Sequence, residues 1–176
     1  MTRLYEELII DIPDYPEPGV IFKDVTPVFA NARAFAEVID DLCEHFIDYG
    51  VTKVLGAEAR GFMVGSAVAY RLGAGFVPAR KPGKLPREVI SQSYELEYGT
   101  DSLEIHADAL SENDVVLIID DLVATGGTCV AMAKLARSQG AKLAGMGFFL
   151  ELEFLNPRDA IAKDVDCEVF SLVQVK

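Results

Sequence analysis

The chain has 176 residues, of which 51% are hydrophobic, and it carries a formal net charge of −12 at pH 7. This length and composition are most economically explained by one globular domain with a sizeable core. The acidic balance argues against nucleic acid or an anionic membrane surface as a partner.

The cysteines and the N-terminal residues exclude several further classes of protein. Cys43, Cys129 and Cys167 are widely spaced and none belongs to a C-x-x-C pair, so neither a disulfide framework nor a zinc site is expected. Glu6 and Glu7 stand among the first apolar residues, unlike a signal peptide, and no apolar run approaches membrane-spanning length. We therefore expect a soluble, cytoplasmic protein with no membrane partner.

Taken in chain order, the first part of the sequence predicts an irregular segment and then a helix. Residues 1–29 are rich in proline and cannot form one regular element. Apolar residues then recur at helical spacing over residues 32–49, and Gly50 is placed to end that helix.

The rest of the chain alternates short apolar runs with helical patterns, which indicates a parallel sheet with right-handed crossovers. The expected strands cover residues 53–57, 76–79, 115–119, 144–150 and 169–172, and the expected helices cover residues 62–72 and 128–139.

One segment, residues 81–106, interrupts this alternation. Tyr94, Leu96, Leu103 and Ile105 alternate with polar residues on either side of a Gly-Thr pair, which is typical of a hairpin. We expect this hairpin to project from the sheet as a mobile flap. No domain linker is visible, so residues 1–176 are predicted to form a single domain.

Two adjacent carboxylates, Asp120 and Asp121, directly follow the apolar run of residues 115–119, and the turn over residues 125–128 (Thr-Gly-Gly-Thr) opens the next helix. Open α/β sheets bind ligands at the carboxyl ends of their strands. Glycines let backbone N–H groups approach an anion, and the helix N-terminus favours negative charge. The pattern predicts a ligand with both hydroxyls and a phosphate, hence a sugar phosphate.

The alternative interpretation of these residues is a plain strand-to-helix turn. Two like charges at one strand end repel each other unless a ligand, a metal or hydrogen-bond donors relieve them, which favours a functional role. Neither a Walker A pattern nor G-x-G-x-x-G occurs in the chain.

Two further segments supply cations to the predicted phosphate site. Arg60 follows the strand over residues 53–57 and could hold two pyrophosphate oxygens, although it could also simply pair with Glu58 on the surface. Residues 80–87 form a basic run that is by default a solvated face. In so acidic a chain, we interpret this run as the source of positive field for a pyrophosphate.

These motifs together resemble a known family. The stretch over residues 120–128 resembles the phosphoribosyl-pyrophosphate (PRPP) motif of the type I phosphoribosyltransferases. Residues 18–27 resemble the base-binding loop of one branch of that family, the adenine phosphoribosyltransferases. The same branch is matched by residues 56–62, 80–86 and 94–99, and the whole resemblance runs from about residue 13 to residue 151.

The resemblance implies a type I phosphoribosyltransferase fold. This α/β fold has a central parallel sheet flanked by helices, a small N-terminal hood over residues 1–30 and a protruding β-hairpin flap. The implied reaction converts adenine and PRPP to AMP and pyrophosphate, a step of purine salvage. It is a Mg²⁺-assisted displacement at ribose C1′ through an oxocarbenium-like transition state. A homodimer is also implied, with Arg80 or Lys81 as candidates for reaching the neighbour's site.

The resemblance also assigns roles to residues. Phe22 would stack on adenine, while the backbone C=O of Ile21 and N–H of Lys23 would read the 6-amino group and N1. Glu97 would arrive with the flap to handle the purine proton, although its neighbours Glu95 and Glu104 have similar chemistry. The implied catalytic residues are Glu97, Asp120, Asp121 and Arg60. The implied PRPP-binding residues are Asp120, Asp121, Ala124, Thr125, Gly126, Gly127, Thr128, Glu58, Ala59, Arg60, Arg80, Lys81 and Lys84.

Mg²⁺ is implied without a direct protein ligand, since it would sit on the ribose hydroxyls and the pyrophosphate and meet Asp120 and Asp121 through water. Beyond Glu151 the resemblance thins, which leaves Glu151 and Leu152 as candidates for closing the far side of the base pocket. Two alternatives stay open: an enzyme of this fold acting on xanthine, guanine or another 6-oxopurine, and a non-catalytic PRPP-sensing regulator.

Overall fold

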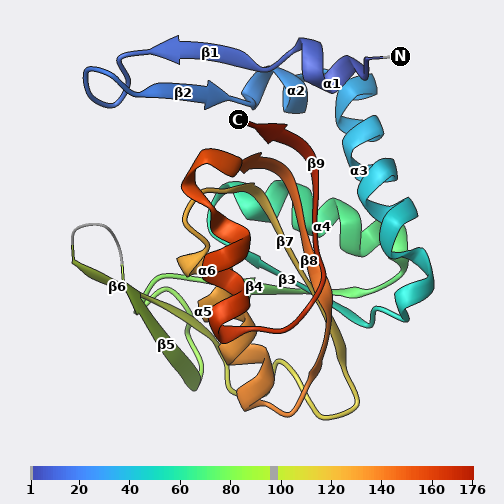
Figure 1. Cartoon of the computed structure of the whole chain (residues 1–176). Helices are drawn as coiled ribbons and strands as arrows, with labels where there is room; N and C mark the ends of the chain where they lie inside the picture. Colours follow the sequence, from blue (N-terminus) through green and yellow to red (C-terminus); the bar gives the residue numbers. More distant parts are fainter. Residues whose placement is uncertain (1, 96–98) are drawn as a thin grey trace. The chain divides into compact units, whose positions relative to one another are not determined.

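The computed structural model describes residues 2–95 and 99–176, and two compact units make up the chain, Met1–Asp41 and Leu42–Lys176 (Figure 1). The hood expected over residues 1–30 falls within the first unit. That residues 1–176 act as one domain stays a prediction.

The first unit consists of short elements, as expected for a proline-rich segment. Its elements are α1 (Leu4–Glu7), β1 (Ile10–Pro13), β2 (Ile21–Asp24), α2 (Thr26–Ala30) and most of α3 (Ala32–Phe46). β1 and β2 pair antiparallel in a sheet of their own.

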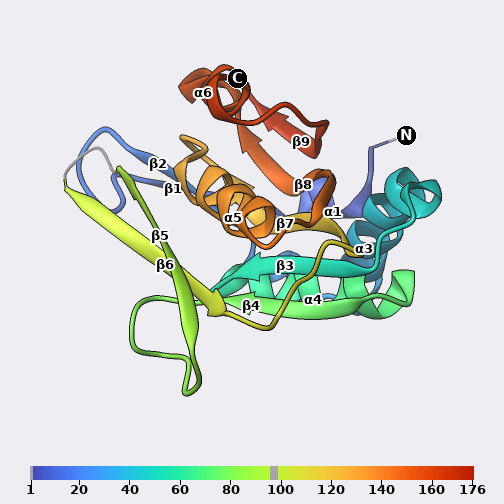
Figure 2. The same ribbon diagram turned by 90° about the horizontal axis from the view of Figure 1, so that it is seen from below.

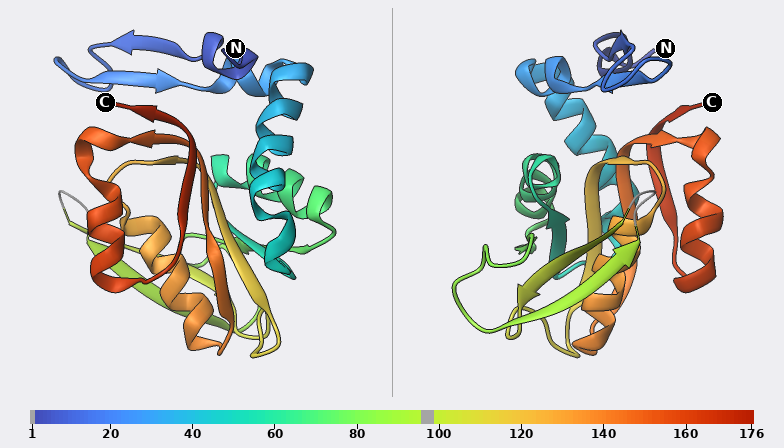
Figure 3. Two further views of the ribbon diagram at one scale, coloured as in Figure 1. Left: turned by 45° about the vertical axis from the view of Figure 1, so that its right-hand side comes forward. Right: turned by 90° about the vertical axis from the view of Figure 1, so that its left-hand side faces the viewer.

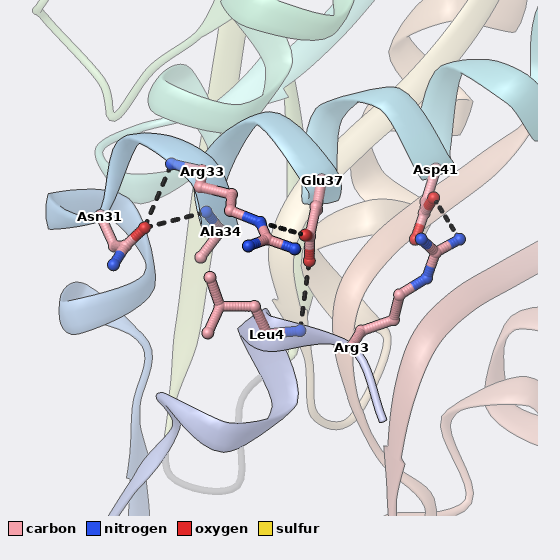
Figure 4. A network of polar contacts seen from close by, with 7 residues as sticks. All are labelled: Arg3, Leu4, Asn31, Arg33, Ala34, Glu37 and Asp41. Carbon is pink, nitrogen blue, oxygen red and sulfur yellow. Dashed lines mark hydrogen bonds and ion pairs between the residues drawn. The ribbon is translucent and has the colours of Figure 1, made fainter. Parts of the chain in front are cut away.

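A side-chain cap begins α3 (Figure 4). Asn31 Oδ1 accepts hydrogen bonds from the backbone N–H groups of Arg33 and Ala34, both at 3.1 Å. The first N–H groups of a helix have no partner within the helix, so this side chain satisfies two of them.

Acidic residues of α3 hold the start of the chain within the first unit (Figure 4). Glu37 Oε2 accepts the backbone N–H of Leu4 at 3.1 Å. Asp41 accepts from Arg3 at 2.9 Å and from the hydroxyl of Tyr5 at 3.0 Å, and the Tyr5 side chain is buried. The N-terminal turn is therefore tied to α3 by three separate donors.

A five-stranded parallel sheet forms the centre of the second unit, with the strand order β4-β3-β7-β8-β9. The alternation of strands and helices predicted from the sequence is confirmed. The strands are β3 (Lys53–Ala57), β4 (Gly75–Ala79), β7 (Val115–Val123), β8 (Lys142–Leu152) and β9 (Val169–Val175). The helices are α4 (Arg60–Leu72), α5 (Gly127–Ser138) and α6 (Pro157–Asp164), with short 3-10 turns at Ile47–Tyr49 and Glu153–Leu155.

Helices cover both faces of this sheet, with α5 on one face and α4 on the other (Figure 2). Along β7, Val116 and Ile118 belong to the same buried cluster as the apolar residues of α5. Leu117 and Ile119 alternate with them and are also fully buried. Burial on both faces explains why the sequence of this strand is continuously apolar instead of alternating.

Several boundaries differ from the sequence expectations. The first helix ends at Phe46 and not at residue 49, because residues 47–49 tighten into a 3-10 turn before Gly50 adopts a left-handed φ of 67°. The α6 helix was missed, since it is short and offers little apolar periodicity beyond Ile161. Among the residues that the structure describes, no helix combines the length and hydropathy needed to cross a bilayer.

The predicted hairpin is confirmed as a separate two-stranded sheet of β5 (Val89–Glu95) and β6 (Thr100–His106) (Figure 3). It is anchored at its base, because Leu103 and Ile105 are buried in the cluster that includes α5. Arg80 and Glu104 also exchange two backbone hydrogen bonds, at 2.9 and 2.8 Å. The mobility of the flap over residues 81–106 stays a prediction.

Replacing Asn31 with Ala should lower the free energy of unfolding by about 1 kcal/mol, because the cap of α3 is lost. In a chain of this size that corresponds to roughly 2–4 °C in Tm, measurable by calorimetry. Asn113→Ala, in an exposed turn, serves as the control and should leave Tm within about 1 °C. Equal effects of the two substitutions would contradict a capping role for Asn31.

Candidate functional site

A cavity of about 440 Å³ opens at the carboxyl ends of β3 and β7. These strands are parallel neighbours, so the loops that follow them meet at one edge of the sheet. The cavity is lined by residues from the β3–α4 loop, from β7, from the hairpin and the segment that precedes it, and from the start of α5. They include the predicted site residues Glu58, Ala59, Arg60, Lys81, Asp120, Asp121 and Thr128.

The acidic pair lies within β7, which continues to Val123 instead of ending at residue 119 as expected. Leu122 and Val123 pair with Leu150 and Glu151 of β8, and this pairing extends the strand beyond the carboxylates. Asp121 is buried with 3% of its surface exposed. Its backbone N–H donates to Asp120 Oδ1 at 2.9 Å.

The carboxyl group of Asp120 is costly to ionise in this position. Burial raises its pKa well above the usual range, and the neighbouring Asp121 carboxylate raises it further. One guanidinium offsets part of this charge: Arg60 Nε lies 2.8 Å from Asp121 Oδ2. Arg60, expected to hold pyrophosphate, is thus placed directly beside the acidic pair.

Gly61 allows α4 to begin this close to the carboxylates. A Cβ atom at this position would lie 2.7 Å from Asp120 Oδ1, well inside van der Waals contact. The sequence pattern assigns no role to Gly61, and its place directly after Arg60 is the one local signal for this contact.

The predicted phosphate loop connects β7 to α5. A second cavity of about 110 Å³ is lined by residues of this loop together with Asp120 and Phe148. Gly126 adopts φ of 90°, a left-handed conformation that favours glycine, and directly precedes the first residue of α5. The predicted residues Ala124, Thr125, Gly126, Gly127 and Thr128 all line this cavity. The N-terminus of a twelve-residue helix therefore opens onto it.

Cys129, in the first turn of α5, is a structural thiol. Its Sγ donates to Gly126 O at 3.1 Å, and burial raises its pKa to about 12. The thiol stays protonated and supports the loop backbone.

Arg80 and Lys81 of the basic run are paired with carboxylates. Arg80 donates to Glu58 Oε2 at 3.3 Å and to Lys84 O at 3.4 Å. The Lys81 ammonium pairs with Asp101 of β6, while its backbone N–H donates to Glu58 Oε1 at 2.6 Å. That backbone hydrogen bond is the largest cause of a lowered pKa of Glu58. Neither carboxylate is predicted from the sequence as a partner of this run.

The predicted base-binding residues lie on β2 in the first unit, paired with β1. Ile21 is 58% exposed, the Phe22 ring meets Tyr15 edge-on with centroids 5.2 Å apart, and Lys23 Nζ lies 2.6 Å from Asp11 Oδ1. The remaining predicted catalytic residue, Glu97, lies outside the described residues.

Glu151, a candidate for closing the base pocket, is 1% exposed at the end of β8. Arg158 of α6 donates to both of its carboxylate oxygens, at 2.9 and 2.8 Å. Such a two-point contact favours a structural role for Glu151, which ties α6 to the sheet.

Comparison with known proteins gives one consistent result. The family model described as the phosphoribosyl transferase domain matches residues 24–174. The adenine phosphoribosyltransferase of Aeromonas salmonicida is 50% identical over 173 residues, covering 98% of this chain and 95% of the relative. That of Phocaeicola vulgatus is 54% identical over 155 residues, covering 88% and 89%.

Solved structures agree in fold along nearly the whole chain. The adenine phosphoribosyltransferase of Thermoanaerobacter pseudethanolicus has a TM-score of 0.92 at 47% identity and covers 97% of this chain and 98% of its own. The enzyme of Giardia lamblia, solved with 9-deazaadenine, has a TM-score of 0.91 at 35% identity, with coverage of 98% and 96%. That of Saccharomyces cerevisiae, solved with an imino-altritol bisphosphate and adenine, has a TM-score of 0.87 at 37% identity, with coverage of 96% of each chain. The type I fold predicted from the sequence is confirmed.

Replacing Asp120 with Asn should stabilise the ligand-free protein near neutral pH. Because the folded-state pKa of Asp120 is raised, the folded protein loses stability as pH rises from the ordinary pKa of an aspartate to that raised value. Asn carries no charge, so the gain should be about 1 kcal/mol or more near pH 7, equivalent to roughly 2–4 °C in Tm, and should vanish towards about pH 3.

Asp121→Asn is the matched control for this prediction. It also removes one of the two charges but breaks the pair with Arg60, so it should give a smaller gain in Tm or a loss. Calorimetry of both variants across pH tests the pair. An Asp120→Asn variant that is less stable than the wild type near pH 7 would contradict the electrostatic account.

Proposed function

This chain belongs to the phosphoribosyltransferase family, and we propose that it catalyses the reaction of adenine with PRPP to give AMP and pyrophosphate. The observation that carries the proposal is the acidic pair of β7 lying beside both a phosphate loop and Arg60. Identity of 50% and 54% to two adenine phosphoribosyltransferases over the aligned residues supports the choice of adenine.

The ribose phosphate part of PRPP suits the two cavities. The backbone N–H groups at the start of α5 would hold the 5′-phosphate, with the hydroxyls of Thr125 and Thr128. Asp120 and Asp121 would accept hydrogen bonds from the ribose 2′- and 3′-hydroxyls. Hydrogen-bond donors to a carboxylate favour its charged form. The ribose hydroxyls would therefore offset the burial and the Asp121 charge that raise the pKa of Asp120.

The pyrophosphate would leave from C1′ towards Arg60, Arg80, Lys81 and Lys84. Negative charge grows on the leaving pyrophosphate while positive charge grows on the ribosyl ring. Positioned cations stabilise the negative charge on the pyrophosphate. A closing hairpin would exclude the water that otherwise hydrolyses PRPP.

Mg²⁺ is the proposed cofactor. Among the described residues, no group of three or more His, Cys, Asp or Glu side chains is arranged to hold a metal ion. The acidic pair offers hard oxygen ligands, which fits a cation bound mainly by substrate oxygens and water, with Asp120 and Asp121 reached through water. When bound, the ion neutralises charge on the pyrophosphate.

Base selection is assigned to the β2 segment of the first unit. Phe22 would stack on the purine. The C=O of Ile21 would accept from the 6-amino group of adenine, and the N–H of Lys23 would donate to the neighbouring N1. A 6-oxopurine presents the reverse pattern and would leave buried polar groups unpaired, which is a strong source of discrimination.

Homodimerisation in the cytoplasm is a further part of the proposal. Met63 and Tyr70 of α4 are 42% and 89% exposed and lie two turns apart on one side of that helix. Light scattering of the purified protein measures the mass of the assembly, and a monomer at working concentration would contradict this part.

The activity itself is tested by incubating the protein and Mg²⁺ with PRPP and one base at a time, with pyrophosphate release as the readout. We expect adenine to be preferred over hypoxanthine, guanine and xanthine by about 10⁴ in kcat/KM. Preference for a 6-oxopurine would point to the alternative enzyme. No pyrophosphate release with any base would favour the regulator.

The role of Glu97 is tested against its neighbour on the same hairpin. Glu97→Ala should lower kcat about 10²-fold or more, because a positioned proton-handling group contributes that much. Glu95→Ala, an exposed residue at the end of β5, should change kcat by less than about twofold. Equal losses in the two variants would remove Glu97 from its assigned role.

A further inference from the structure

Lys81 lies in the wall of the larger cavity, but its ammonium group is bound by the hairpin. Nζ pairs with Asp101 Oδ2 and donates to the hydroxyl of Tyr94 at 3.2 Å. Tyr94 and Asp101 stand directly opposite each other in the β5–β6 register, so one ammonium contacts both strands. The Tyr94 hydroxyl in turn donates to Asp101 Oδ2 at 3.4 Å.

The position of the Lys81 backbone is set separately from its side chain. Its N–H donates to Glu58 Oε1 in the β3–α4 loop, which keeps the residue at the cavity whatever the ammonium contacts. Lys81 and Asp101 side chains are 40% and 28% exposed, so the pair can exchange partners without leaving a buried charge.

We propose that Asp101 is a positioning residue that competes with pyrophosphate for Lys81 and thereby weakens the binding of PRPP and pyrophosphate. The inference rests on the proposed function of this site. In the ligand-free protein Asp101 holds the ammonium against the hairpin. When a pyrophosphate group enters, Lys81 turns to it, and Asp101 recovers the ammonium as the product leaves.

Two further observations agree with this competition. Burial lowers the pKa of Lys81, but the hydrogen bonds that its ammonium donates to Asp101 and Tyr94 together outweigh burial, and the pKa is raised. The same ammonium is the largest cause of a lowered pKa of Asp101. Both partners are therefore charged near neutral pH. The phosphate groups of pyrophosphate carry several negatively charged oxygens, and such a group can displace a single carboxylate from an ammonium.

The competition predicts that removing the charge of Asp101 strengthens anion binding. In Asp101→Asn, Oδ1 can still accept the Ser102 N–H that it accepts at 2.8 Å in the wild type, so local structure is kept. Titration calorimetry with pyrophosphate and Mg²⁺ should give about three- to fivefold tighter binding, the size expected for one partly exposed ion pair. KM for PRPP should fall by a similar factor while kcat does not rise.

A double-mutant cycle separates this mechanism from the general effect of removing a negative charge near a polyanion. Lys81→Met should weaken pyrophosphate binding, and Asp101→Asn should then have no effect in the Lys81→Met background. Asp164→Asn removes a carboxylate of α6 that is paired with Lys134, outside the basic run, and should leave pyrophosphate binding unchanged.

Unchanged binding in Asp101→Asn would overturn the proposal, and so would equal tightening in the wild-type and Lys81→Met backgrounds. Because binding is measured without adenine, its outcome is independent of the activity test. A protein that binds pyrophosphate as described but makes no AMP would leave the Asp101 inference standing and overturn the proposed function. Absence of pyrophosphate binding to the wild type would overturn both.

Discussion

Two adjacent carboxylates, Asp120 and Asp121, repel each other near the end of β7, and the chain around them is arranged to hold them there. The backbone N–H of Asp121 and the guanidinium of Arg60 offset part of their charge. Gly61 has no Cβ atom, and any other residue at this position would place one too close to the carboxyl group of Asp120. The remaining imbalance appears as the raised pKa of Asp120, and ligand hydroxyls are suited to relieve it.

That constraint explains why a stable core surrounds an electrostatically unfavourable site. β7 is paired with β3 up to Ile119 and with β8 on past the carboxylates to Val123, and the apolar residues that precede the pair are buried, so the strand holds the backbone of the pair in place. Sites of this kind lower stability locally and gain function in return. The phosphate loop is placed by the same strand, since α5 begins directly after it.

A net charge of −12 raises the question of how such a chain would attract a polyanion. The structure pairs two cations near the acidic pair with carboxylates: Arg80 with Glu58, and Lys81 with Asp101. Partly exposed pairs of this type cost little to break. Under the proposed function these cations remain available to a pyrophosphate, and their present partners would set how tightly it is held.

The local elements and their order can be predicted from the sequence alone. Apolar runs ended by glycine located the strands and helices of the parallel sheet, because strand and helix periodicity are short-range properties. The same reasoning located the acidic pair next to the phosphate loop, since those residues are adjacent in the chain. It could not foresee α6, whose short sequence carries little periodicity, or the extension of β7, which depends on pairing with β8.

Which charged residues become partners depends on how the strands are arranged in three dimensions. The strand order β4-β3-β7 brings Arg60 to Asp121, sixty-one positions apart, and the hairpin register brings Asp101 and Tyr94 to Lys81. Side chains of one charge have several candidate partners along a sequence. The choice among them is made by long-range backbone pairing, which no local pattern of residues records.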